Sequence, residues 1–488
     1  MIRFRITRRA LASAPARFAA AAPSRAAAIV PSGGAAVAPS TGCAIAPPGV
    51  APLARSGIAA LALCALFAAG AARAELSDVE RRIVDAVRAR TPHALELLER
   101  TVRINSGTLN VAGVREVGAV YRSELEALGF SVRWADMPPE MNRAGHLVAT
   151  QAADPAYKGP RLLLLGHMDT VFEKASPVAA WERRGERVRG QGVSDMKGGN
   201  VILLEGLRAL HAFGQLDGAA VTVLLTGDEE RVGSPLERAR AALVEAAKAS
   251  DAALSFEGGG PRGEASITRR SSGSWTLTVK AKPGHSAGIF SPQSGYGAVF
   301  EAARILNAFR EQLIEPNVTF NPGVVVGGTQ VDYSDATAAG NAFGKTNVIA
   351  KDFVVRGDLR YLTPEQGERT KQKMRDIVAA SLPGASATIA FRDGYPPMPP
   401  SDGGRKLIAT LSQASQDAGF GPAEAMDPAR RGAGDVQFAA PYIAGIDGLG
   451  ARGSGSHTDD EDLEIASIER NAIRAAIFMQ RLIHSPWP

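Results

Sequence analysis

"LLLLGHMDTVF", residues 162–172, places a histidine and an aspartate two positions apart at the end of four consecutive leucines. A short apolar run that ends in polar residues is typical of a strand buried on both faces of a sheet. Residues i and i+2 of a strand point to the same side, so His167 and Asp169 are expected to face the same way. The stretch therefore predicts a buried strand whose tip presents an imidazole and a carboxylate.

The sequence around this strand alternates between helix and strand patterns. Helical spacing is found at 75–100, 114–130, 197–214 and 234–250, and apolar strand patterns at 161–169, 219–230 and 251–259. Such alternation predicts an α/β fold with a mostly parallel sheet covered by helices. The same texture returns at about residue 397 and ends in a helix at 467–483. The larger domain is therefore expected to comprise 75–267 and 397–488.

A different pattern fills residues 268–396. "SGSWTLTVKAK" (272–282) alternates as a half-exposed strand does, and a helical pattern follows at 295–313. Strands are expected within 318–332 and 347–362, a helix within 363–382 and a last strand at 387–394. This β-α-β-β-α-β order predicts a ferredoxin-like α+β domain inserted into the larger one.

Residues 1–74 read as a targeting segment. They hold eight of the 55 basic residues and none of the 50 acidic ones. Arg55, the apolar run "GIAALALCALFAAGA" and "ARA" before Glu75 form the pattern of a secretory signal. A run of about 15 residues is short for a bilayer span. We expect a secreted, periplasmic protein without a stable membrane span after signal cleavage; a retained anchor or a cytoplasmic location are the alternatives.

Charge and cysteine content narrow the classes of function. The sequence pI near 9.2 comes from the targeting segment, because the remaining chain has slightly more acidic than basic residues. That balance and the lack of a basic stripe disfavour a nucleic-acid partner. Both cysteines, Cys43 and Cys64, also lie in that segment. A metal in the mature chain must therefore be held by His, Asp and Glu.

Acidic residues and histidines gather at the expected strand ends and in two loops. In an open parallel sheet these ends lie at one edge, where ligands bind. The residues are His167 and Asp169, the run Asp228–Glu230, Glu257, Asp195 in "GQGVSDMKGGN", and His457 in "GSGSHTDDEDLEI". Clustered carboxylates repel one another unless a cation lies between them. Two imidazoles and three of these carboxylates would suit a pair of divalent ions, with zinc expected.

The positions of these residues suggest which of them bind metal, which orients a ligand and which acts as a base. Five ligands for two ions require one bridging carboxylate, and Asp195, on a loop between strand ends, is best placed. Asp169 is expected to accept the free ring N–H of His167 and to fix its tautomer. Side chains of the adjacent Glu229 and Glu230 diverge in extended chain. One of the two is then a ligand and the other a general base.

The ordered motifs resemble the di-zinc aminoacylase and carboxypeptidase family, and in particular its glutamate carboxypeptidases. The resemblance covers about 80–488 and rests on "GHMDTV", "GVSDMKGG", "TGDEE", "LSFEGG", "KPGHSAG", "NVIAKDFVVRGDLRY", "GAGD" and "GSGSHTDDEDLEI". It implies two zinc ions per subunit, one held by His167, Asp195 and Glu257 and the other by Asp195, Glu230 and His457. It also implies that Glu229 is the general base and that the peptide after Asp195 is cis.

The resemblance also assigns roles to the inserted domain, as a lid through which a homodimer forms. His285 is expected to reach the partner subunit's site and steady the tetrahedral oxyanion. Asn347 and Arg360 match positions that grip a substrate carboxylate, a task that suits the planar fork of arginine. The lysine that related glutamate-releasing enzymes carry before the lid is not evident, and Arg269 and Arg270 are the nearest candidates to replace it.

These observations predict metal-dependent hydrolysis of an amide bond next to a free C-terminal carboxylate. The substrate would be a small peptide or an N-acyl amino acid, and the released amino acid is expected to be glutamate. An aminoacylase or dipeptidase of other specificity is the alternative within the enzyme class. A non-catalytic, metal-bearing periplasmic binding protein is the alternative outside it.

Overall fold

The computed structural model describes residues 75–487. The expected signal segment and both cysteines lie outside these residues. The first helix, α1 (Asp78–Val102), begins where the sequence supplies a capping box. The Ser77 side chain accepts the Glu80 N–H, and Glu80 Oε2 accepts the Ser77 N–H at 2.7 Å. Among residues 75–487, no helix has both the length and the apolar content needed to cross a bilayer.

The central sheet has six strands in the order β1-β2-β6-β3-β7-β14. Strands β6, β3, β7 and β14 are parallel, and β2 and β1 add antiparallel strands at one edge. The bounds are β1 Ser131–Ala135, β2 His146–Gln151, β3 Leu162–His167, β6 Val221–Thr226, β7 Ala252–Ser255 and β14 Ala444–Ile446. In this register His167 pairs with Thr226, so β3 and β6 end side by side. The expected α/β fold with a mostly parallel sheet is confirmed.

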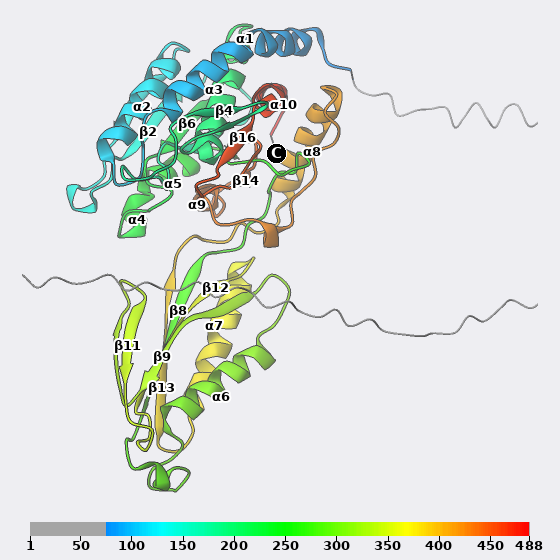
Figure 1. Cartoon of the computed structure of the whole chain (residues 1–488). Coiled ribbons are helices and arrows are strands. Elements are labelled where there is room, and N and C mark those ends of the chain that lie inside the picture. Colours follow the sequence, from blue (N-terminus) through cyan, green and yellow to red (C-terminus); the bar gives the residue numbers. More distant parts are fainter. Residues whose placement is uncertain (1–74, 488) are drawn as a thin grey trace, which may run out of the picture. The chain divides into compact units, whose positions relative to one another are not determined.

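Both faces of the sheet are covered, which explains the four consecutive leucines. Leu162 and Leu164 pack in one hydrophobic cluster with α1, α2, α3, α8 and α10, while Leu163 and Leu165 pack in another with α5 and α9. Figure 1 shows α1, α2 and α3 together on one side of this sheet. The helices are α2 Val111–Glu126, α3 Gly198–His211, α4 Leu236–Ala239, α5 Ala241–Lys248, α8 Asp402–Asp417, α9 Val436–Ala439 and α10 Ala466–Ile483.

A second, small sheet brings distant loops together. Its order is β15-β16-β5-β4, and β5 pairs antiparallel with β16 through Asp462 and Arg189. The bounds are β4 Glu182–Arg184, β5 Arg187–Arg189, β15 Gly453–Ser454 and β16 Asp462–Glu464. The short turns are η1 Pro139–Met141, η2 Val193–Lys197, η3 Ser286–Gly288 and η4 Pro428–Arg430. The β5–β16 pairing places the loop before Asp195 beside the loop that carries His457.

The inserted segment forms a four-stranded antiparallel sheet in the order β13-β8-β12-β9. Its elements are β8 Gly273–Ala281, α6 Gly297–Gln312, β9 Thr319–Gly328, β12 Asp352–Arg360, α7 Pro364–Ala379 and β13 Ala385–Asp393. Trp275, Leu277 and Val279 alternate along β8 and pack against α6 and α7, which cover one face. This is the expected ferredoxin-like arrangement.

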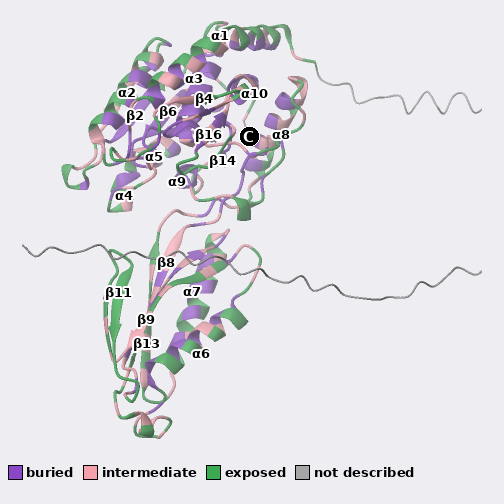
Figure 2. Ribbon diagram, in the orientation of Figure 1, coloured by how far each residue is buried: buried purple, intermediate pink, exposed green. Residues whose placement is uncertain are grey.

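One feature of this segment was not expected from the sequence. The predicted strand at 318–332 is interrupted after Gly328, and a separate hairpin follows, made of β10 (Gln330–Ser334) and β11 (Ala339–Phe343). Every residue of β11 is exposed (Figure 2). The apolar alternation of the hairpin is too weak to distinguish it from a continuation of β9.

Candidate metal centre

His167 ends β3 and is almost fully buried, with 1% of its side chain exposed. Its Nδ1 lies 3.0 Å from the main-chain oxygen of Asp169. Because a carbonyl oxygen only accepts hydrogen bonds, Nδ1 carries a proton, and in a neutral ring Nε2 is the atom with a free lone pair. That Nε2 lies 3.2 Å from Asp195 Oδ1 and 3.4 Å from Glu257 Oε1.

The Asp195 carboxylate is shared between two groups of side chains. Its Oδ1 faces His167, while its Oδ2 lies 3.2 Å from His457 Nε2. The same His457 nitrogen lies 3.0 Å from Glu230 Oε2. The structure thus brings together all five residues expected to bind metal, with Asp195 in the bridging position. The Asp195–Met196 peptide is cis, as the resemblance implies.

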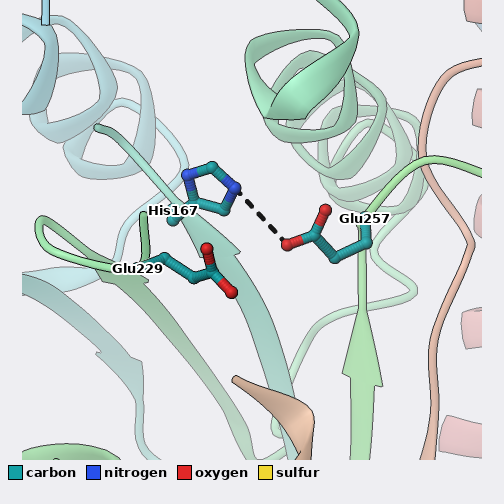
Figure 3. Close-up of side chains that lie close together, drawn as sticks. All are labelled: His167, Glu229 and Glu257. Atoms are coloured by element: carbon teal, nitrogen blue, oxygen red, sulfur yellow. Dashed lines mark ion pairs between the residues drawn. The ribbon is translucent and has the colours of Figure 1, made fainter. Parts of the chain in front are cut away.

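Glu229 belongs to the same cluster but has different neighbours. Its carboxylate lies near His167 and Glu257, with potential ligand atoms of all three within 4.8 Å of one another. Figure 3 shows these three side chains converging, with the ion pair drawn only between His167 and Glu257. Among the described residues, no imidazole, lysine or arginine lies within 4.0 Å of the Glu229 carboxylate. Burial, followed by the charges of Glu257, Asp435 and Glu230, raises the pKa of Glu229 well above its usual value.

Asp169 differs from expectation in one contact. The acceptor nearest to His167 Nδ1 is the Asp169 main-chain oxygen, and the carboxylate Oδ1 is 3.6 Å away. The carboxylate instead accepts the N–H groups of Glu229 and Glu230, at 3.0 and 3.1 Å, and the Thr108 hydroxyl at 2.6 Å. β3 ends at His167, so Asp169 lies beyond the strand, where the regular alternation of side chains no longer applies. Asp169 therefore orients both the imidazole and the two adjacent glutamates.

Glu461 is a residue that the sequence reasoning missed. It is fully buried, and its Oε1 accepts the N–H groups of Ser194 and Asp195 at 2.8 and 3.0 Å. Burial, with the charge of Asp195 next, raises the pKa of Glu461 to about 7. In the sequence Glu461 belongs to "DDED", which is typical of a solvated acidic run. Its burial and its contacts with Ser194 and Asp195 show that it faces inward, just before β16 pairs with β5.

The cluster fits divalent cations. No lysine or arginine of residues 75–487 lies within 4.0 Å of the carboxylates of Asp195, Glu230 or Glu257, so only imidazoles oppose them. Glu230 Oε1 is buried and has no hydrogen-bond partner in the described chain. Nitrogen and oxygen donors in this number match the preferences of zinc. The donor set therefore has an unmet need for positive charge, which bound cations would supply.

The three residues expected to act from the lid form no polar contact with this cluster within the described chain. His285 is exposed, and the neighbouring Ser286 N–H donates to the main-chain oxygen of Asn347 at 2.9 Å. Asn347 is also exposed. Arg360 ends β12, and its Nε donates to Asp358 at 3.1 Å. No hydrogen bond or ion pair within residues 75–487 joins these three to the expected metal ligands.

Arg269 is excluded as a replacement for the absent lysine. Only 2% of the residue is exposed, and its Nη2 donates to Asp447, whose side chain is fully buried. Its Nη1 donates to the Gly432 carbonyl at 2.8 Å. The guanidinium therefore forms its hydrogen bonds within the protein rather than with substrate. Arg270 donates to Thr319 at 3.2 Å and is only partly buried.

Known proteins are similar to this chain in sequence or in fold. The chain is 29% identical over 428 residues to carboxypeptidase G2 of Pseudomonas sp. (strain RS-16), covering 85% of this chain and 94% of that protein. It is 26% identical over 408 residues to succinyl-diaminopimelate desuccinylase of Halorhodospira halophila, covering 79% and 96%. Among solved structures, YxeP of Bacillus subtilis, described as a dinuclear metal binding peptidase, has a similar fold with a TM-score of 0.55 at 14% identity, covering 81% and 99%.

A family model also matches the chain. The model described as peptidase family M20/M25/M40 matches residues 163–481. This span is more than half of the chain and contains the five residues that converge on the candidate metal centre. The chain therefore belongs to the peptidase family M20/M25/M40.

Proposed function

We propose that the protein is a dinuclear zinc hydrolase that cleaves the amide bond next to a free C-terminal carboxylate and releases glutamate. Family membership supports the coarser statement, a metal-dependent peptidase or aminoacylase. The relatives named carboxypeptidase G2 and succinyl-diaminopimelate desuccinylase support an acyl amino acid or small peptide as substrate. One observation carries the proposal: Asp195 divides its carboxylate between two imidazole–carboxylate pairs.

Cations at this donor set would supply the electrophilic part of the chemistry. When bound, they would polarise the scissile carbonyl and make an attacking water acidic enough to lose its proton near neutral pH. His167, Asp195 and Glu257 would hold one ion, and Asp195, Glu230 and His457 the other. Glu461 fixes the N–H groups of Ser194 and Asp195, which lead into the expected bridging carboxylate, and Asp169 fixes the backbone that carries the glutamates.

Glu229 is assigned the proton transfers. Its carboxylate is in the cluster but is not paired with an imidazole, and cations bound beside it would favour its charged form, which could take a proton from the attacking water. The same oxygen then delivers that proton to the departing amine. Main-chain contacts hold the residue in place: its N–H donates to Asp169, and its carbonyl accepts the Tyr395 hydroxyl at 3.3 Å. A general base fixed in this way contributes roughly 10²–10⁴-fold to the rate.

Substrate recognition is assigned to the lid. Arg360 uses Nε to reach Asp358, and its two Nη groups make no hydrogen bond within the described residues. Those groups would bind the substrate's free carboxylate through paired hydrogen bonds, with the exposed Asn347 amide beside it. The partner subunit's His285 would stabilise the oxyanion, which requires a homodimer.

An exposed aromatic cluster on the lid supports the homodimer. Phe290, Tyr296 and Phe300 are 55%, 36% and 49% exposed. The Phe290 ring centroid lies 5.5 Å from that of Tyr296 and 5.3 Å from that of Phe300. Grouped exposed aromatics are typical of an interaction surface.

The proposed export of the mature chain rests on the sequence of residues 1–74 alone. N-terminal sequencing of the protein from a periplasmic extract would test it, with Glu75 expected as the first residue.

A substrate panel tests the function. Zinc-loaded enzyme is offered N-acyl derivatives of glutamate, aspartate, alanine and lysine, dipeptides, and N-succinyl-diaminopimelate, with released amine as the readout. We expect fastest release from N-acyl-glutamate and loss of release with a chelator. Preference for another amino acid would replace the glutamate assignment with an aminoacylase or dipeptidase. Tight binding without release in any case would favour the metal-bearing binding protein.

The assignment of the base has its own test. Glu229→Gln should keep both metals by elemental analysis and lose roughly 10²–10⁴-fold in kcat, because the amide cannot take the proton. Glu140→Gln is the matched control, since Glu140 is exposed and pairs with Arg238 rather than with an expected metal ligand. Near-full activity of Glu229→Gln with metals bound would assign the proton transfer to another group.

A further inference from the structure

A cavity of about 150 Å³ opens beside the first turns of α10, and no expected metal ligand lines it. Its wall includes four arginines, Arg262, Arg452, Arg470 and Arg474. The remainder comes from the glycine-rich loop 259–263, Asn471, Ser415 of α8, and Phe420 and Pro422 just after that helix. We call this cavity the arginine pocket. A cavity of this volume holds one molecule of about the size of benzene.

Arg474 has an unmet hydrogen-bonding need. It is 8% exposed, one Nη donates to the Gly263 carbonyl at 2.9 Å, and its Nε is buried without a partner in the described chain. No carboxylate of residues 75–487 lies within 4.0 Å of its guanidinium. Burial, and then the charge of Arg470, lowers the pKa of Arg474 to about 10. A buried cation without a counter-charge is costly, so an anion at this position would be stabilising.

The charge around the pocket is far from balanced. Glu464 is shared between Arg452 at 3.4 Å and Arg470 at 3.3 Å. Arg262 is exposed and has no ion pair within the described residues. Arg470 and Arg474 stand four residues apart on α10, a like-charge spacing that weakens a helix by itself. One carboxylate thus opposes four guanidinium groups, and the buried one, Arg474, is not paired with it, so additional negative charge would be stabilised here.

The side chain of Asn471, which also lines the pocket, has an acceptor atom without a hydrogen-bond donor. Its Nδ2 donates to the Gly450 carbonyl at 2.6 Å, which fixes the orientation of the amide. Its Oδ1 is buried and accepts no hydrogen bond within residues 75–487. An anion that also carries an O–H group would satisfy both this acceptor and the arginines. Hydrogen phosphate has such a group, whereas sulfate and the dianion of a phosphate monoester do not.

We propose that the arginine pocket is a binding site for inorganic hydrogen phosphate. Guanidinium groups bind phosphate oxygens through paired, charge-assisted hydrogen bonds, and the pocket presents four of them around a space of matching size. Asn471 lines the pocket, and its unpaired Oδ1 would accept a hydrogen bond from the protonated oxygen. The site is distinct from the expected metal ligands, so the proposal goes beyond the hydrolytic function and does not depend on it.

Calorimetric titration of the zinc-loaded enzyme tests the site. Inorganic phosphate, sulfate and methyl phosphate are titrated separately near neutral pH into wild type and into Arg470→Gln and Arg262→Gln. Removing one charge-assisted partner should weaken phosphate binding about tenfold or more. Arg310→Gln, on the exposed face of α6, removes the same charge elsewhere and should leave the affinity unchanged. Wild type should bind phosphate at least about tenfold more tightly than sulfate or methyl phosphate.

Each result decides the matter. Weakened phosphate binding in both pocket variants, with a normal Arg310→Gln, supports the site. Unchanged affinity in the pocket variants would mean that phosphate binds elsewhere, the metal centre included, and would overturn the proposal. Absence of phosphate binding to wild type, or equal affinity for all three anions, would overturn it too. The substrate panel measures a different property, so failure of one proposal leaves the other standing.

Discussion

Replacing Arg240 with methionine is the most demanding test of how the strand ends are held. Arg240 is 1% exposed, and its Nε donates to Asp435 Oδ1 at 2.8 Å while Nη1 donates to Asp228 Oδ1 at 2.6 Å. The side chains of Asp228 and Asp435 are 0% and 7% exposed. Burial lowers the pKa of Arg240, but Asp435 and Asp228 raise it well above its usual value. The guanidinium is therefore held charged between two buried carboxylates.

The size of the effect follows from what the substitution leaves behind. Removing one partner of a buried ion pair costs about 3–5 kcal/mol, because the remaining charge stays desolvated and unpaired. Here two carboxylates lose the same partner. Asp435 keeps the Thr226 hydroxyl at 2.6 Å, and Asp228 keeps the Gly233 N–H at 2.8 Å, so part of their solvation is retained. We expect Arg240→Met to lower the free energy of unfolding by about 3–5 kcal/mol.

Urea denaturation followed by far-UV circular dichroism provides the measurement. Arg310→Met removes an exposed arginine and should change the free energy of unfolding by less than about 0.5 kcal/mol. The triple variant Arg240→Met, Asp228→Asn, Asp435→Asn removes the stranded charges and should be more stable than Arg240→Met alone. An Arg240→Met protein within about 1 kcal/mol of wild type would refute the reasoning that the pairs are buried and charged.

Three further predictions concern residues whose roles emerged from the structure. Glu461→Ala should weaken metal binding by roughly 10–100-fold in a competition with a chelating dye, because it leaves the N–H groups at the bridging carboxylate unpaired; unchanged affinity would remove Glu461 from the support of the site. Burial raises the pKa of Glu80, but hydrogen bonds from Arg481 and the helix N-cap outweigh it, and the pKa is lowered from 4.5. A lowered folded-state pKa stabilises the protein above pH 4.5, and this stabilisation is lost as the pH falls through the folded-state pKa. The difference in Tm between wild type and Glu80→Gln should therefore be present at neutral pH and shrink on acidification. A difference in Tm that grows in acid would contradict this sign. Arg269→Met should lower Tm because it removes one of the two arginines paired with the buried Asp447 and leaves only Arg431 at 3.1 Å, with KM for substrate unchanged in the surviving folded enzyme; a raised KM with normal Tm would return Arg269 to substrate recognition.

Much of the fold could be predicted because its signals are local. Four consecutive leucines with polar ends predict a strand covered on both faces, and the alternation of Trp275, Leu277 and Val279 predicts one covered on a single face. The capping box at Ser77 marks the beginning of α1. Element boundaries were less accurate: the helix expected at 234–250 is split into α4 and α5, and the strand expected at 318–332 ends at Gly328. Turn geometry depends on neighbouring elements, which periodicity does not describe.

The site was predicted only in part, because the directions of its side chains also depend on neighbouring elements. The order of the motifs identified the expected metal ligands, because each lies in a strong local pattern. These residues are His167, Asp195, Glu230, Glu257 and His457. The direction of the Asp169 carboxylate depends on where β3 ends and on the positions of the N–H groups at 229 and 230. The commitment of Arg269 to Asp447 joins residues far apart in the chain.

The sequence by itself determined the strand-and-helix alternation, the inserted domain and the kinds of side chain available for metal binding. These properties follow from side-chain chemistry and from periods of two and 3.6 residues, which are written along the chain. Only the tertiary structure decided which atoms meet: β5 pairs with β16, and this pairing delivers His457 to Asp195 and turns Glu461 inward. Contacts of this kind join residues separated by more than 250 positions, and their geometry is set by packing and burial across the whole domain rather than by any local run of residues.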